Sequence, residues 1–179
     1  TAYPRIINQK HFDRLRGLLE GQRLLVGGQV LEDSMQITPA LVDQPAADSP
    51  LMQEEIFGPI LPILVVQDME EAVAFVRSRP HPLALYLFTR SKQTENQVLG
   101  RLSFGGGCVN DTVLHLAGAH MPFGGVGESG MGHYHGKAGF DTFTHHRSVL
   151  KKARLFDLPL RYHPYKDPMR ILPAWLLKH

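Results

Sequence analysis

The sequence predicts an α/β fold in which parallel strands are flanked by helices. Segments with helix and strand character alternate at short spacing along the 179 residues. The run Leu83–Phe88 is almost continuously apolar, as is typical of a strand covered on both faces of a parallel sheet. Before it, Asp68 and Glu71 have the spacing of a capping box, which marks the start of a helix.

The first part of the chain is expected to open with a helix. Asn8 is a suitable N-cap, the helix runs to about Glu20, and Gly21 follows its end. Its apolar stripe consists of Phe12, Leu15, Leu18 and Leu19. The elements expected next are a strand over 23–26, a turn at 27–28, an extended segment over 35–42 that Pro39 interrupts, and a loop over 44–50.

The middle of the chain carries the most regular alternation. The apolar segment Ile60–Val66 is a candidate buried strand, and the helix that starts at Asp68 is expected to run to Arg79, where prolines stop it. The elements expected next are the strand 83–88, a helix over 91–102 with Val98, Leu99 and Leu102 facing inward, and a strand over 105–109 that leads to Asn110.

Composition argues against several classes of protein. The formal net charge is only +2, and the basic residues are scattered, so nucleic-acid binding receives no support. The single cysteine, Cys108, excludes an internal disulfide framework and suits a reducing compartment, so we expect a cytoplasmic protein. No apolar run approaches the roughly 18 residues of a membrane-spanning helix.

The glycine-dense run from Met121 to Arg147 is expected to form a shaped loop. A strand-like segment that includes Phe140, Phe143 and Val149 is expected at its end. Three glycines, at 125, 127 and 130, spell the G-x-G-x-x-G of dinucleotide-binding folds. The context contradicts that interpretation, because no strand precedes the motif and no helix follows it directly.

Two other candidate sites are weak on their own. His133 and His135 could present two imidazoles to a metal, but no carboxylate or thiol is spaced to complete a ligand set, so no metal site is predicted. Cys108 lies in a strand-like SFGGGCVND context, where a small buried thiol is more common than a nucleophile.

Glu54 and Glu55 stand next to Ile56 and Phe57. Adjacent carboxylates repel each other unless one of them has a partner. In an extended backbone, Glu55 and Phe57 would share one face and could offer a carboxylate for a diol and a ring for stacking. The alternative is a solvated acid beside a core phenylalanine.

A set of motifs, taken in order and spacing, closely resembles the aldehyde dehydrogenase superfamily. These motifs are RIINQKHFDRL, QEEIFGPILPI, PLALYLFT, VND and PFGGVGESGMGHYHGKAGFDTFTHHRSVL, and they cover essentially the whole chain. The first motif and the stretches YHGK and FDTFTHHR point to the class 3 branch of the superfamily.

The resemblance implies a subunit with a Rossmann domain, a catalytic α/β domain and a β-ribbon for oligomerisation. The chain is expected to be the C-terminal portion of such a subunit, without the nucleophilic cysteine, the general base or the Rossmann domain. Its expected parts are a portion of the catalytic domain over 1–139, an oligomerisation strand over 140–152 and an extended tail over 153–179.

The same resemblance implies three site residues and no catalytic residue in this chain. Glu55 matches a glutamate that binds the nicotinamide ribose hydroxyls, Phe57 matches a ring that packs beside the nicotinamide, and Phe123 matches an aromatic residue of the aldehyde pocket. The segment 113–120 matches a variable loop that shapes substrate choice. The implied reaction is the oxidation of a small-molecule aldehyde to a carboxylic acid with NAD or NADP, through a thiohemiacetal and a thioester.

Other functions stay open at this point. The chain could be a non-catalytic fragment or interaction module that self-associates through the 142–150 strand, or a hydrolase that uses Cys108. An apolar face without its nucleotide-binding domain and an unpaired strand edge both invite association, so we expect a dimer or a higher oligomer, with a homodimer through that strand preferred. The C-terminal ILPAWLLKH is apolar enough to touch a membrane surface but too short to span one, and packing on the body or on a partner subunit is the preferred role.

Overall fold

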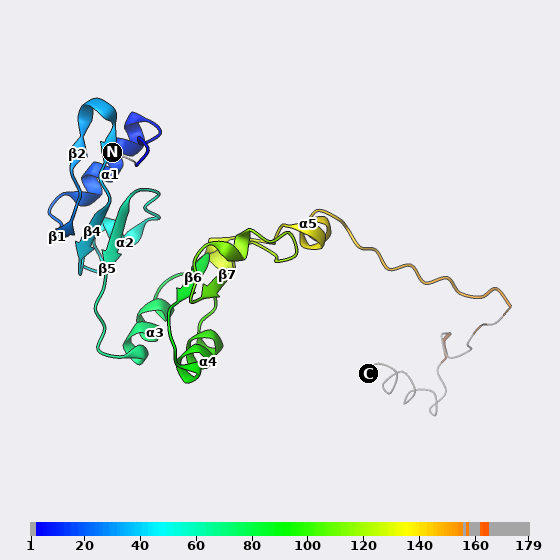
Figure 1. Ribbon diagram of the computed structural model, residues 1–179. Coiled ribbons are helices and arrows are strands. Elements are labelled where there is room, and N and C mark those ends of the chain that lie inside the picture. Colours follow the sequence, from blue (N-terminus) through cyan, green and yellow to red (C-terminus); the bar gives the residue numbers. More distant parts are fainter. Residues whose placement is uncertain (1–2, 156, 158–161, 165–179) are drawn as a thin grey trace.

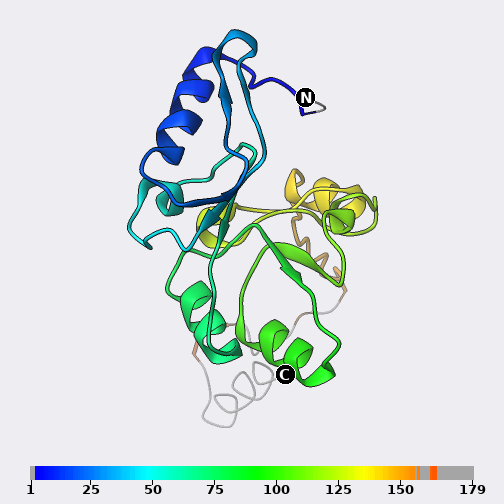
Figure 2. The same cartoon turned by 60° about the vertical axis from the view of Figure 1, so that its left-hand side comes forward.

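The computed structural model describes residues 3–155, 157 and 162–164. Two groups of elements follow each other along the chain (Figures 1 and 2). Each group has its own hydrophobic core. The first group comprises α1 (Gln9–Leu19), β1 (Leu24–Val26), β2 (Val30–Leu31), η1 (Glu32–Ser34), β3 (Gln36–Ile37), β4 (Ala40–Asp43), α2 (Pro50–Gln53) and β5 (Ile60–Ile63). The second comprises α3 (Met69–Arg77), β6 (Ala84–Leu87), α4 (Lys92–Arg101) and β7 (Gly106–Val109), and the chain continues through η2 (Leu114–Leu116), η3 (Gly127–Ser129) and α5 (Gly136–Thr142).

Helix α1 begins and ends where the sequence predicts. The side chain of Asn8 accepts a hydrogen bond from the backbone N–H of His11, which satisfies one of the free donors of the first turn. The predicted apolar stripe is buried, and Phe12 and Leu15 are fully enclosed. This stripe forms the centre of the first core, against Ile37, Val42 and Leu51.

The first core is closed by a three-stranded sheet of order β1-β4-β5. Strands β4 and β5 are parallel, in keeping with the predicted fold class, whereas β1 pairs antiparallel with β4. The strand predicted over 60–66 is shorter in the structure, where β5 ends at Ile63. The predicted extended segment 35–42 is divided at Pro39 into β3 and β4, which belong to different sheets.

The small hairpin β2–β3 and the one-turn helix α2 were not predicted. Each strand of the hairpin has only two residues, so no alternation of apolar and polar side chains could reveal it. The hairpin turns through η1, and Met35 at the end of η1 has a left-handed φ of 49°. Helix α2 begins at Pro50, at the end of a segment whose composition predicts a loop.

The second group has two parallel strands with a helix before each of them. Strands β6 and β7 pair in parallel, in agreement with the prediction. Asp68 caps α3 and Ser91 caps α4, each through a side-chain oxygen that accepts a backbone N–H. The second core is formed by Val73 of α3, Leu87 of β6 and Val98 of α4.

Two predictions about burial in this group are wrong. The run Leu83–Phe88 was expected to be covered on both faces, but Tyr86 and Phe88 are exposed in this chain. Leu99 was expected to face inward from α4 and is also exposed, because the helix rests on the core through Val98 and Leu102. One face of the β6–β7 sheet is therefore only partly covered by the described residues.

The glycine-dense run forms a loop, as predicted, but its end differs from the prediction. The strand expected to begin at 140 is replaced by helix α5, which includes Phe140 and ends at Thr142. Residues 145–153 have no regular element and lead away from the body of the molecule (Figure 1). The pairing of this segment with another subunit stays a prediction, and most of the predicted tail over 153–179 lies outside the described residues.

Candidate functional site

The segment that carries Glu55 is attached to helix α1 by one arginine. Nη1 of Arg14 lies 2.5 Å from Oε1 of Glu54, and Nη2 donates a 2.6 Å hydrogen bond to the carbonyl oxygen of Ile56. Glu54 is thus the member of the acidic pair that has a partner. Glu55 is exposed, and among the described residues its carboxylate makes no hydrogen bond or ion pair.

The side chain of Phe57 projects from this segment into solvent. Its side chain is 77% exposed, and its φ of 47° lies in the left-handed region that side chains other than glycine rarely adopt. The backbone is therefore not extended at Phe57, and the simple alternation that would place Glu55 and Phe57 on one face is wrong. A surface pocket of about 370 Å³ lies beside the ring and is lined by residues 3–7, His11 and Phe57–Pro59.

Phe123 is held by the glycine loop through its main chain. It exchanges two backbone hydrogen bonds with Tyr134, of 3.0 and 2.9 Å, in an isolated antiparallel bridge. Its ring is surrounded by three others, with centroids 5.6 Å away at Tyr134, 5.8 Å at His115 and 6.2 Å at His135. Phe123 also lines a pocket of about 280 Å³ in the glycine loop.

His115 anchors the loop 113–120 in the body of the chain. Its side chain is 5% exposed, and the ring packs edge-on against Tyr86 of β6. Its Nδ1 lies 3.7 Å from Sγ of Cys108, while Nε2 is buried without a hydrogen-bond partner among the described residues. The histidine that the sequence placed in a variable loop is thus a core residue beside Phe123.

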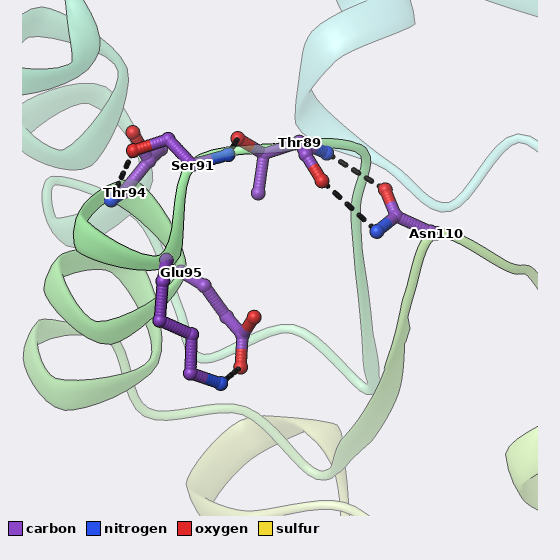
Figure 3. Close-up of polar contacts among 6 residues, drawn as sticks. Thr89, Ser91, Thr94, Glu95 and Asn110 are labelled. Carbon is purple, nitrogen blue, oxygen red and sulfur yellow. Dashed lines mark hydrogen bonds and ion pairs between the residues drawn. The ribbon is translucent and has the colours of Figure 1, made fainter.

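Asn110 ties the ends of two strands together. Its side chain accepts a hydrogen bond from the backbone N–H of Thr89 and donates one to the carbonyl oxygen of Thr89 (Figure 3). Both polar ends of the amide are therefore used within the chain.

The other histidines form no metal site within the described part of the chain. No group of three or more His, Cys, Asp or Glu side chains is close enough there to hold an ion. His146 instead lies 3.4 Å from Asp141 of α5. The pKa of Asp141 is lowered, first because Lys137 donates a hydrogen bond to its carboxylate and then because of the positive charges nearby.

The three predicted site residues do not form one cluster. Phe57 and Phe123 line different pockets, one on the first group of elements and one in the glycine loop. Sequence reasoning missed Arg14, because nothing in its neighbourhood indicates a contact with a segment forty residues away. It also missed the packing of Tyr134 and His135 around Phe123, although both belong to the YHGK motif.

Together, the parallel strands and the helices that flank them define part of an α/β domain. The model of the aldehyde dehydrogenase family matches residues 4–149. The chain belongs to the aldehyde dehydrogenase family.

Relatives from distant organisms support the same assignment. The chain is 49% identical over 97% of its length to the 4,4'-diaponeurosporen-aldehyde dehydrogenase of Staphylococcus aureus, of which it covers 38%. It is 50% identical over 93% of its length to human aldehyde dehydrogenase family 3 member B1, of which it covers 36%. The substrate-bound structure of Staphylococcus aureus AldH superposes with a TM-score of 0.85 at 48% identity, and covers 96% of this chain and 38% of that one.

The chain is much shorter than the relatives that it matches. It spans between about a third and two fifths of the length of these relatives, and family 3 members are prominent among them. In the described part of the chain, no helix combines the length and apolar character needed to cross a bilayer.

Proposed function

We propose that this chain is the C-terminal portion of the catalytic domain of an NAD(P)+-dependent aldehyde dehydrogenase. The reaction would oxidise a small-molecule aldehyde to a carboxylic acid. The observation that carries the proposal is that the free carboxylate of Glu55 and the exposed ring of Phe57 belong to one short segment that α1 holds in place, in a chain of this family.

The chemistry of these two side chains fits a nicotinamide ribose. An ionised carboxylate has two oxygen acceptors and can accept hydrogen bonds from both hydroxyls of a diol. Glu55 is exposed and makes no contact within the described chain that would compete for those oxygens. The exposed ring of Phe57, two residues further along the same segment, offers an apolar surface.

The nucleophile is proposed to lie in the remaining part of the subunit. A cysteine thiolate attacks the carbonyl carbon to give a thiohemiacetal, whose oxidation gives a thioester that water hydrolyses to the acid and the free thiol. NAD(P)+, when bound, supplies the acceptor for the hydride that leaves the thiohemiacetal. In this scheme Glu55 and Phe57 orient the cofactor, and Phe123 with its surrounding rings forms a wall of the aldehyde pocket.

Cys108 is not proposed as the nucleophile, because it lies within β7 and is half-buried beside His115. Its free thiol supports the proposal that the protein works in a reducing compartment such as the cytoplasm.

A homodimer is proposed on the basis of the segment after α5. Val149 and Leu150 are 69% and 90% exposed, and residues 145–153 have no partner strand among the described residues. An exposed apolar segment of this kind invites pairing with a second chain. The same observation favours the alternative of a non-catalytic self-associating module.

The activity is tested in the full-length subunit, in which this chain is joined to the remaining part of a family subunit, such as that of the Staphylococcus aureus relative. Absorbance at 340 nm, with aldehyde and with NAD+ or NADP+ supplied in turn, reports reduced cofactor. We expect aldehyde-dependent reduction that persists in Cys108→Ser and is absent from the 179-residue chain alone. Self-association of a stable full-length subunit without any reduction would instead support the non-catalytic alternative.

A further inference from the structure

We propose that Arg14 is a positioning residue for cofactor binding: it acts through the main chain of the 54–56 segment to hold Glu55 and Phe57 in place. This inference rests on the proposed function of Glu55 and Phe57. Arg14 itself does not touch the cofactor in this scheme.

The two hydrogen bonds of Arg14 lie on either side of Glu55. One guanidinium nitrogen binds the side chain of Glu54 and the other binds the carbonyl oxygen of Ile56, at 2.5 and 2.6 Å. Since a guanidinium is planar and rigid, two bonds from one such group fix the spacing of their acceptors. The residue between these two acceptors therefore loses much of its freedom.

The helix that carries Arg14 is itself firmly anchored. Phe12 and Leu15, on the same helix, are fully buried in the first core, and the Arg14 side chain is only 26% exposed. A guanidinium on such a helix therefore holds the segment that it binds in a fixed position relative to the core. The segment has no regular secondary structure of its own between α2 and β5 to provide this rigidity.

A second contact with α1 lies on the other side of Phe57. Gly58 is so close to Leu15 that a Cβ added there would lie 2.5 Å from Cδ2 of Leu15. Arg14 and Leu15 thus fix the chain immediately before and after Phe57. Between the two anchors, Phe57 adopts its left-handed φ and turns its ring outward.

This arrangement explains why an unfavourable backbone conformation persists at Phe57. A left-handed conformation in a residue other than glycine is retained only where the surrounding structure determines it, and such residues gather at functional sites. Here both determinants come from consecutive residues of α1. Removal of the guanidinium is expected to let the 54–57 segment relax and to displace Glu55 from the ribose.

The chain provides a matched control on the same helix. Arg16 forms a 2.9 Å ion pair with Glu32 of η1 and so also connects α1 to a neighbouring segment. Neither residue of that pair forms a hydrogen bond or an ion pair with the 54–57 segment among the described residues. A purely structural role for arginines on α1 would make Arg14→Gln and Arg16→Gln behave alike.

The test compares these variants in the full-length subunit, with Glu55→Gln as the reference for the cofactor site. Steady-state kinetics give KM for NAD(P)+ and for the aldehyde, and thermal unfolding gives Tm. For Arg14→Gln we expect about a tenfold rise in cofactor KM, equivalent to about 1.4 kcal/mol, with less than about a twofold change in aldehyde KM. Arg14→Lys should lie in between, because a lysine cannot reproduce the fixed fork of the guanidinium.

The outcomes separate this inference from the proposed function. Equal cofactor KM values for Arg14→Gln and Arg16→Gln would overturn the inference if Glu55→Gln still raises that KM, and would leave the cofactor role of Glu55 intact. If Glu55→Gln also has no effect on cofactor KM, both the cofactor site and the inference are overturned. A selective rise in Arg14→Gln, without a Tm change larger than that of Arg16→Gln, supports the positioning role.

Discussion

Phe123 and Tyr134 face each other across the glycine loop and exchange two backbone hydrogen bonds of 3.0 and 2.9 Å. This bridge closes the ten-residue loop between them and fixes the main chain that carries the ring of Phe123. The loop between the two residues can be this tight because it is built largely from glycine. The position of the proposed aldehyde-pocket residue is therefore set by the main chain rather than by side-chain packing alone.

The tightness of this loop gives the first prediction. A Cβ at Gly125 would lie 2.1 Å from the carbonyl oxygen of Ser129, and a backbone atom cannot move away cheaply. We expect Gly125→Ala to destabilise the full-length subunit by about 2 kcal/mol, as overpacked substitutions do. Thermal unfolding measures the loss of stability. Gly118→Ala is the control, because a Cβ added at Gly118 would have only Cγ of Met121, at 3.8 Å, within 4 Å. Equal Tm values for the two variants would contradict the close approach.

The helix caps give the second prediction. The carboxylate of Asp68 accepts a hydrogen bond from the backbone N–H of Glu71 at the start of α3, so Asp68→Ala should cost about 1 kcal/mol in the free energy of unfolding. Ser49 occupies the equivalent position before α2, but its hydroxyl makes no capping bond and is buried without a partner among the residues that the structure describes. Ser49→Ala should therefore cost much less. Denaturant unfolding compares the two, and an equal loss would argue against the capping role of Asp68.

The third prediction concerns pH. The pKa of Glu70 is lowered, first because Arg101 donates a hydrogen bond to its carboxylate and with help from the positive charge of Arg101. Because the folded-state pKa lies below the unfolded-state value, the contribution of this link is complete above the ordinary glutamate pKa of about 4.3 and is lost as the pH falls through the folded-state value. Glu70→Gln should thus lower Tm at pH 7 and have no effect at low pH.

Thermal unfolding of the wild type and Glu70→Gln at about pH 7 and pH 3 measures this difference. Glu128→Gln is a suitable control, since Glu128 is exposed and makes no ion pair within the described residues. The same Tm difference between wild type and Glu70→Gln at both pH values would contradict the linkage.

The fourth prediction concerns the proposed dimer. The double substitution Val149→Glu and Leu150→Glu places two charges on the exposed segment that is proposed to pair between subunits. Light scattering after size-exclusion chromatography should show a dimer for the wild-type full-length subunit and a monomer for this variant. Leu99→Glu, on the exposed face of α4, is the control and should remain dimeric. A dimer in all three would place the interface elsewhere.

The sequence predicted the elements whose signals are local. The caps at Asn8 and Asp68 and the apolar stripe of α1 are each set by neighbouring residues, and the structure confirms them. The parallel pair β6–β7 followed from the alternation of helices and strands. These features need no knowledge of distant contacts.

The errors arose where the outcome depends on contacts far along the chain. Helix α5 replaces the expected strand at Phe140, in a stretch whose glycines and aromatics give no clear periodicity. The left-handed φ of Phe57 depends on its neighbours Gly58 and Ile56 being held by α1, and the sequence contains no sign of that contact. Glu55, Phe57 and Phe123 were identified through family motifs rather than through any local physical signal.

The most direct test of the account is the affinity of the full-length subunit for its nicotinamide cofactor with and without the carboxylate of Glu55. Isothermal titration calorimetry with NAD+ and with NADP+ gives Kd for the wild type, for Glu55→Gln and for the control Glu20→Gln at the end of α1. Loss of a charged hydrogen bond of about 1.5–3 kcal/mol predicts a Kd raised about tenfold or more in Glu55→Gln alone. An unchanged Kd in Glu55→Gln, with the wild type binding cofactor normally, would contradict the proposed role of this chain in holding the cofactor.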